Sequence, residues 1–65
     1  MLNTVALPAL MDQQKAAEYL GISEKKLERD RWMEKRIPYV KLGRHVRYRA
    51  ADLLEYVESN IVRVR

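Results

Sequence analysis

The sequence contains no cysteine and no phenylalanine, and it has a single histidine among its 65 residues. Without cysteine the chain has neither a disulfide framework nor a thiolate metal site, and one histidine excludes a histidine-rich metal site. No apolar run approaches the ~20 residues that cross a bilayer. The first eight residues also lack the basic leader of a signal peptide. From these absences we expect a cytoplasmic protein with no metal and no membrane partner.

The short length limits the chain to one domain. A chain of this size buries only ~60% of the surface that its unfolded form exposes, which leaves little room for an enclosed active site or a cofactor cleft. Hydrophobic residues make up 48% of the chain and charged residues 34%, which is typical of a folded domain. We expect no cofactor and no catalytic residue, because the carboxylates fall on helix faces with no third group to orient them.

Positive charge is concentrated in the middle of the chain. Residues 24–49 carry ten Lys and Arg against four carboxylates, a net charge of +6, whereas residues 1–23 and 50–65 carry −1 each. Such a stretch is typical of a surface that binds a polyanion, because Lys and Arg neutralise phosphates. The alternative is a solvated face that only aids solubility.

Two helices are predicted on either side of a tight turn. Asp12 suits the N-cap of a helix over 13–20, and Gly21 suits the left-handed residue that ends it. Ser23 then suits the N-cap of a second helix. Only three residues separate the two helices, which is the spacing of a helix-turn-helix. The apolar side of the first helix consists of Ala16, Ala17 and Leu20.

The second helix has an irregular apolar pattern. Leu27 is expected in the core, but its helical neighbours Asp30 and Arg31 are charged. We therefore expect a short helix that ends near 31–34, with Trp32 turned back to cover the core. Tyr39, Tyr48 and Tyr56 are also expected to fill the core rather than to stack on bases.

A β-hairpin is predicted after Pro38, which disfavours helix in the residue before it. Two alternating segments, 39–42 and 45–48, flank the turn dipeptide Gly43-Arg44. The expected inward side chains are Val40, Leu42, Val46 and Tyr48. The expected outward cations are Lys41, His45, Arg47 and Arg49, with Arg44 at the tip.

A third helix is predicted over 50–59, with Leu53, Leu54 and Val57 on its apolar face and Tyr56 at the edge. The secondary structure of the tail is ambiguous, because its sequence alternates like a strand and also continues the apolar stripe of a helix.

We divide the chain into an N-terminal arm (1–9), a domain (10–59) and a C-terminal tail (60–65).

The order of elements and three segments resemble a known family. Segments 16–23 (AAEYLGIS), 37–44 (IPYVKLGR) and 46–49 (VRYR), followed by Asp52-Leu53, resemble the small winged-helix domains of the excisionase family. This family is related to the AlpA regulators and to the DNA-binding heads of MerR-type activators. The resemblance covers roughly residues 10–58 and implies an α+β fold, a winged helix-turn-helix. The chain departs from the pattern at Asp30 and Arg31, where many members carry an apolar or aromatic residue in the second helix.

The resemblance implies a module that binds duplex DNA, with the second helix in the major groove and the hairpin wing in the adjacent minor groove. On chemical grounds Lys25, Lys26 and Arg29 would meet base edges, and Arg29 would grip a guanine. Glu28 would accept from a cytosine amine or would instead pair with a helical neighbour such as Arg31. The alternative for the two lysines is simple solvation.

Phosphate and minor-groove contacts complete the expected DNA-binding set. Ser23 and its neighbouring amides would hold a phosphate at the helix start. The minor-groove candidates are Arg44, His45 and Arg47, although His45 is equally a passive turn residue. The expected phosphate contacts are Lys35, Arg36 and Lys41.

The task implied by the resemblance is architectural. Excisionases bend an attachment-site arm so that a tyrosine integrase assembles an excisive complex. One winged-helix unit buries only ~600–1,000 Å² on DNA, so we expect several copies on direct repeats that self-associate along the DNA. We expect no small-molecule ligand, because the chain shows no effector domain. The expected setting is the nucleoid of a bacterial host of a phage or mobile element.

Alternatives to this hypothesis remain open at the level of sequence. The nearest is an AlpA-like transcriptional regulator that uses the same DNA contacts. The more distant one is a protein-interaction or antirepressor module whose basic face binds an acidic partner. We also expect residues 61–65 or the N-terminal arm to bridge neighbouring copies; the alternative is a frayed tail.

Overall fold

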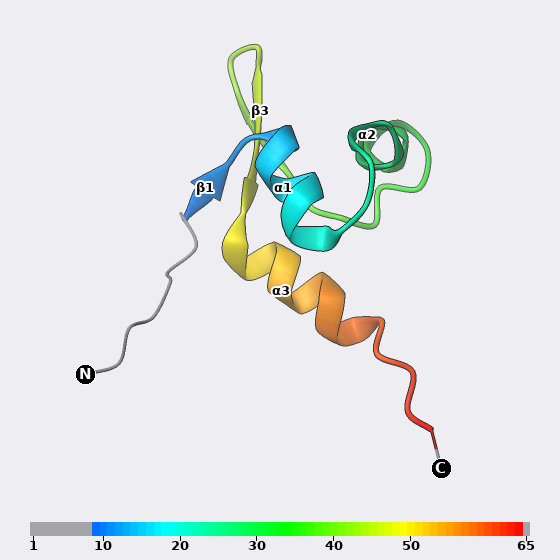
Figure 1. The fold of residues 1–65 in the computed structure, drawn as a ribbon. Helices are drawn as coiled ribbons and strands as arrows, with labels where there is room; N and C mark the ends of the chain where they lie inside the picture. Colours follow the sequence, from blue (N-terminus) through cyan, green and yellow to red (C-terminus); the bar gives the residue numbers. More distant parts are fainter. Residues whose placement is uncertain (1–8, 65) are drawn as a thin grey trace, which may run out of the picture.

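The computed structural model of the protein describes residues 9–64. Its elements follow the order β1 (Leu10–Met11), α1 (Gln13–Leu20), α2 (Glu24–Trp32), β2 (Val40–Leu42), β3 (His45–Arg49) and α3 (Ala50–Ser59) (Figure 1). Three helices and one small antiparallel sheet confirm the predicted α+β winged helix-turn-helix. The predicted arm falls outside the described residues except for its last position, 9.

The two caps predicted for the helix-turn-helix are present. The Asp12 carboxylate accepts the backbone N–H of Lys15 at 2.9 Å, and the Ser23 hydroxyl accepts that of Lys26 at 3.0 Å. Gly21 has φ 70°, a left-handed conformation in which a residue with a Cβ is strained. Asp12 therefore marks the start of α1, Gly21 marks its end and Ser23 marks the start of α2.

The sheet has a third strand, β1, beside the two strands of the predicted hairpin. Its order is β1-β3-β2, and β1 pairs antiparallel with β3 through Leu10↔Arg49 and Met11↔Tyr48. The Ala50 N–H also donates to the Ala9 carbonyl at 3.1 Å. Two residues are too few to show the alternation of apolar and polar side chains that identifies a strand. Only the pairing of β1 with β3 in the structure reveals this strand.

We define the wing as residues 40–49. Its side chains are distributed between the two faces differently from the prediction. Leu42 lies opposite His45 and Val40 opposite Arg47, and cross-strand partners point to the same face of a sheet. The expectation of one apolar and one cationic face was therefore wrong. A two-residue turn necessarily puts Leu42 on the face of His45, and its side chain is 49% exposed. On the other face, Lys41 lies beside Val46.

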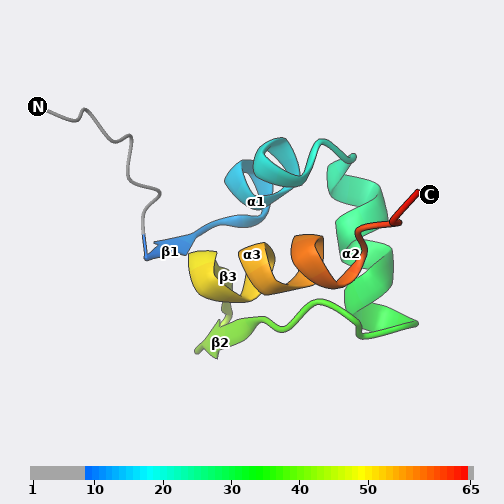
Figure 2. The same cartoon turned by 90° about the horizontal axis from the view of Figure 1, so that it is seen from below.

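The core forms where α1 and α3 pack against β3 and α1 packs against α2 (Figures 1 and 2). Leu27 and Tyr48 are buried as predicted, and Tyr56 packs against the core. Trp32 was expected to cover this core but is 72% exposed. The helical turn directs its side chain away from the side of α2 that carries the buried Leu27 and Asp30. The buried apolar side chains are Met11, Ala16, Ala17, Leu27, Ile37, Tyr48 and Leu53.

Helix α3 has the predicted bounds but not the predicted apolar face. Leu53 is fully buried, whereas Leu54 and Val57 are 50% and 40% exposed. Asp52 and Tyr56 turn toward the molecule instead, because the face that meets β3 runs through these positions. After Ser59 the tail, residues 61–64, is neither strand nor helix, and its side chains are exposed.

The predicted outward cation Arg49 is neutralised within the chain. Its guanidinium donates to both carboxylate oxygens of Asp52, from Nε at 2.7 Å and from Nη2 at 2.8 Å. These hydrogen bonds lower the pKa of Asp52 and raise the pKa of Arg49. The pair therefore joins β3 to the first turn of α3, and it removes one positive charge from the wing.

Stability should depend on this pair in a defined pH window. The lowered pKa of folded Asp52 gives a stabilisation that is present above its unfolded pKa, ~3.9, and is lost as pH falls through the folded value. Asp52→Asn should lower Tm at pH 7, and this difference from the wild type should shrink as the pH falls below the unfolded pKa of ~3.9 and vanish below the folded pKa of Asp52. Thermal melts over a series of pH values from 7 downward test this. Glu58→Gln, which removes an exposed carboxylate from the same helix, is the control; equal effects of the two substitutions would contradict the assignment.

Candidate nucleic-acid interface

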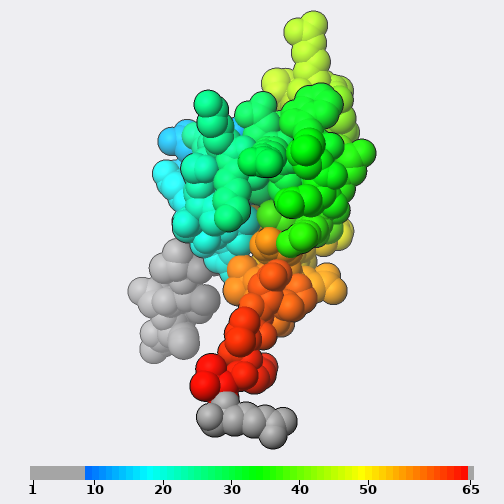
Figure 3. Space-filling model, turned by 90° about the vertical axis from the view of Figure 1, so that its right-hand side faces the viewer, coloured from blue at the N-terminus to red at the C-terminus, as the bar shows by residue number. Residues whose placement is uncertain are grey.

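Helix α2 and the wing lie on one side of the molecule. Figure 3 looks onto this side, with α2 facing the viewer and the wing tip projecting above it. The C-terminal segment extends from the opposite end of the molecule (Figures 1 and 3). The charged central stretch of the sequence therefore folds into two elements that approach a ligand from the same direction.

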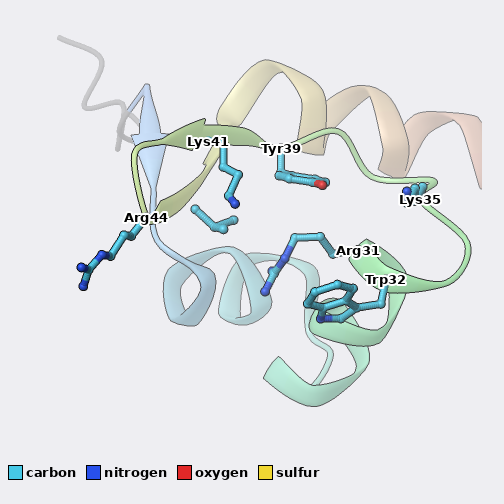
Figure 4. Close-up of a pocket in the computed structure, with 7 residues that line it drawn as sticks. Arg31, Trp32, Lys35, Tyr39, Lys41 and Arg44 are labelled. Carbon is cyan, nitrogen blue, oxygen red and sulfur yellow. The ribbon is translucent and has the colours of Figure 1, made fainter.

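A groove of about 270 Å³ separates the end of α2 from the wing. We call it the α2–wing groove, and Figure 4 shows Lys41 and Tyr39 on its wing side facing Arg31 and Trp32 on α2. Its lining includes four cations and no carboxylate. Within residues 9–64 the side-chain ion pairs are Lys15–Glu18 and Arg49–Asp52, so neither neutralises this groove. The lining residues are Arg31, Trp32, Lys35, Tyr39, Lys41, Arg44 and Val46.

Arg31 connects the parts of the molecule that border the groove. Its Nη1 atom donates to Gln13 Oε1 and to the Tyr48 hydroxyl, both at 2.9 Å. Its guanidinium carbon lies 5.8 Å from the centroid of the Tyr39 ring, a cation–π distance. Burial raises the pKa of Tyr48, and the hydrogen bond from Arg31 acts in the opposite direction. Arg31 thus ties α2 to α1, to β3 and to the segment before β2.

Asp30 anchors the loop that leads from α2 to the wing. Its buried carboxylate accepts the backbone N–H of Ile37 at 3.0 Å and that of Arg36 at 3.3 Å. Its carbonyl accepts the N–H of Lys35 at 2.6 Å. The two charges that interrupt the apolar pattern of α2, Asp30 and Arg31, therefore hold α2 and the wing in place.

The outward face of α2 carries three of the predicted contact residues. Lys25, Glu28 and Arg29 are exposed and lie on the side of the helix opposite the buried Leu27. Within the described chain, no hydrogen bond or ion pair engages Glu28. Its proposed helical partner, Arg31, is bonded to Gln13 and Tyr48 instead. The Glu28 carboxylate is therefore free to accept from a ligand.

Two further predicted residues lie at the edges of this face. The Ser23 oxygen accepts the N–H of Lys26, which leaves the hydroxyl proton available for donation. Lys26 lies on the flank of α2, where it lines one hollow with Lys25 and Arg29 and another with Ile22 and Tyr56 on the α3 side. The structure therefore places Lys26 farther from the wing than the groove residues.

The wing presents cations on both of its faces. Arg44, at the tip, lines the α2–wing groove and also a second hollow beside the start of α1, together with His45 and Arg47. Arg47 is half-buried, and its Nη1 donates to the Val46 carbonyl at 2.8 Å. His45 is exposed. Lys41 is the predicted phosphate contact that points into the groove (Figure 4).

Arg36 is not brought together with the other predicted residues. It lines hollows beside α3 with Asp52, Glu55 and Tyr56, away from the α2–wing groove. Its backbone N–H, rather than its side chain, is held by Asp30. The structure therefore separates Arg36 from the cationic side that α2 and the wing share.

Residues 10–61 match the family model described as a helix-turn-helix domain. The chain belongs to this family. It is a family of small DNA-binding domains that includes excisionase-like and AlpA-like proteins, and it is typically non-enzymatic. No curated protein matches the chain. Membership supports binding of double-stranded DNA by this helix-turn-helix domain.

In residues 9–64 no group of three His, Asp or Glu side chains is placed to hold a metal ion. None of the helices in that range is long and apolar enough to cross a membrane.

The side chain of Tyr39 was expected in the core, but it is 37% exposed and lines the groove of this helix-turn-helix domain. Sequence reasoning also missed Arg31 and Trp32 as groove residues. Both were treated as irregularities of the core pattern. The helical spacing carried the missing signal, because a residue four positions after Glu28 falls on the same outward face. Trp32 therefore belongs with Glu28 and Arg29 rather than with the buried Leu27.

Proposed function

We propose that the protein reads duplex DNA with α2 in the major groove and the wing in the adjacent minor groove, and that it acts as an excisionase. As a recombination directionality factor, it would promote integrase-mediated excision of a phage or mobile element in a bacterial host. The observation that carries the proposal is the shared cationic side of α2 and the wing, with a carboxylate-free groove between them. Membership of the helix-turn-helix family supports it.

On α2, the exposed side chains have the chemistry of base readout. The Arg29 guanidinium can donate two parallel hydrogen bonds to the O6 and N7 acceptors of a guanine. The unpartnered Glu28 carboxylate can accept from a cytosine N4 amine. Lys25 and the amides after Ser23 add contacts to base edges and to a phosphate at the helix start.

Arg29→Ala should change specificity as well as affinity. Loss of a bidentate guanine contact costs about 1–3 kcal/mol at one base pair and leaves the other positions unaffected. Lys41→Ala, a proposed phosphate contact, should instead weaken binding equally on all sequences. Fluorescence anisotropy with duplexes mutated one base pair at a time measures both effects. A uniform loss for Arg29→Ala would contradict base readout by Arg29.

Several copies are proposed to bind direct repeats in an attachment-site arm, to bend it and to contact a tyrosine integrase. One domain of this size makes too small an interface for tight recognition on its own, which favours side-by-side loading. Gel shifts on attachment DNA, with the site placed at different positions along the fragment, test this proposal. The expected result is a cooperative ladder of bent complexes. A single, non-cooperative and unbent complex would refute the excisionase role.

The C-terminal tail is proposed to bridge neighbouring copies. Ile61, Val62 and Val64 are exposed apolar side chains at the end of the molecule away from the wing. Deleting residues 61–65 should reduce the cooperativity of binding to adjacent repeats by roughly 1–2 kcal/mol and spare binding to one site. Quantitative gel shifts on one-site and two-site DNA measure the two effects. Unchanged cooperativity would exclude this role.

An AlpA-like transcriptional regulator is the second candidate, because the matched family also includes such proteins. It would use the same DNA contacts at a promoter. A promoter reporter run beside an integration–excision assay separates the two roles. Excision that depends on the protein, with no change in the reporter, favours the excisionase.

A further inference from the structure

Trp32 is an exposed aromatic side chain inside a cationic groove. Its side chain is 72% exposed, and it is the largest apolar side chain on the surface of residues 9–64. It lines the α2–wing groove together with Tyr39 and with the cations of α2 and the wing (Figure 4). Aromatic rings set among cations are typical of surfaces that hold a nucleic-acid strand, because the cations neutralise phosphates and the rings pack on bases or sugars.

Lys35 occupies an unfavourable backbone conformation at the same groove. Its φ is 53°, in the left-handed region where a side chain with a Cβ is disfavoured. Its N–H bonds to the Asp30 carbonyl at 2.6 Å and so closes the end of α2, a position that suits glycine. The lysine places a cation in the groove at the expense of stability, and such local strain is characteristic of functional sites.

Arg31 is not free to contact a ligand in the same way as the other groove cations. Its guanidinium already donates to Gln13 and Tyr48 and lies over the Tyr39 ring. Arg31 contributes positive potential to the groove while it holds the Tyr39 ring, the aromatic wall of the groove, in position. The side chains available for direct contact are therefore Trp32, Lys35, Lys41 and Arg44.

We propose that the α2–wing groove holds the sugar–phosphate backbone of the DNA strand that separates the two grooves read by α2 and the wing. Trp32 packs its indole against a deoxyribose of this strand, and Lys35 and Lys41 bind the flanking phosphates. This inference rests on the proposed binding of duplex DNA and adds to it a strand-holding site with an aromatic wall. It makes Trp32 a DNA-contacting residue.

Trp32 is the only tryptophan of the chain, so fluorescence excited at wavelengths that tryptophan absorbs and the four tyrosines do not reports on this groove alone. Titration of the full chain with duplex DNA at low salt should change this fluorescence with the same Kd that anisotropy of a labelled duplex gives. Trp32→Ala should weaken binding about tenfold, and Trp32→Phe by less. The control is Met33→Ala, which removes an apolar side chain that is 66% exposed and does not line the groove.

The outcomes separate this inference from the function on which it rests. Duplex binding with unchanged fluorescence, or equal affinities for Trp32→Ala and Met33→Ala, overturns the strand-holding site and leaves the proposed function standing. Absence of duplex binding at low salt overturns both. The wild-type titration needs no variant, so a poorly folded Trp32→Ala would not decide the question.

Lys35 gives an independent test with two readouts. Lys35→Gly should raise Tm, because it relieves the left-handed strain, and should lower affinity for duplex DNA several-fold. Lys35→Ala should lower affinity by a similar factor without raising Tm. A Lys35→Gly protein that binds as tightly as the wild type would remove Lys35 from the site.

Discussion

Replacing Asp30 by alanine is expected to lower the free energy of unfolding by about 2 kcal/mol, the cost of leaving a buried backbone donor unpaired. The carboxylate accepts from the N–H groups of Ile37 and Arg36, and the Ile37 interaction is buried. A domain of this size has only ~3–5 kcal/mol of stability to lose. Tm should fall by about 10 °C in a thermal melt followed by circular dichroism.

The control for this substitution is Glu34→Ala. It removes the same charge from an exposed side chain in the same segment, for which no hydrogen bond is found within residues 9–64. Its Tm should stay close to that of the wild type. If the two variants melt alike, the loop is not anchored by the Asp30 carboxylate.

The double substitution Arg44→Ala/Arg47→Ala is expected to reduce affinity for duplex DNA about 10–100-fold at low salt. Each removed cation takes away about one released counterion, so the slope of log K against log salt should become shallower by about 2. Anisotropy titrations at four or five salt concentrations measure the slope. The control is Arg36→Ala/Arg63→Ala, which removes the same charge from positions outside both the wing and the α2–wing groove.

The DNA side of the same experiment tests where the wing binds. A narrow A·T-rich minor groove has a strong negative potential that attracts inserted arginines. Changing the A·T pairs under the wing to G·C should weaken the wild-type protein and have little effect on the double variant. Equal losses for the two proteins would place the wing outside the minor groove.

Local signals of capping and turn chemistry predicted the elements of this fold well. Asp12, Gly21 and Ser23 act within one or two turns of the chain, so the bounds of α1 and the start of α2 could be derived from sequence. The Gly43-Arg44 turn likewise fixed the hairpin, and 50–59 was the third helix. The positions of the candidate site residues on α2 and the wing could be predicted because the bounds of these elements could be predicted.

Side-chain direction was predicted less well, because it depends on pairing and on packing against distant elements. The turn pairs Leu42 with His45, so these two side chains lie on the same face of the wing. Alternation within each strand does not show which face of one strand meets which face of the other. The direction of Leu54 depends on which side of α3 meets β3. Trp32 and Arg36 were placed by hydrophobicity or charge alone, and neither property reports on orientation.

The Arg31 connections have a mechanical consequence for the duplex. Hydrogen bonds from one guanidinium to Gln13 and Tyr48 couple α2 to α1 and to β3, so α2 and the wing should resist moving independently of each other. If the protein does not change shape on binding, the DNA must deform to fit it. DNA sites would then differ in the free energy that this deformation costs. Flexible TA or CA steps at positions touched by no side chain would be favoured, because they kink most easily.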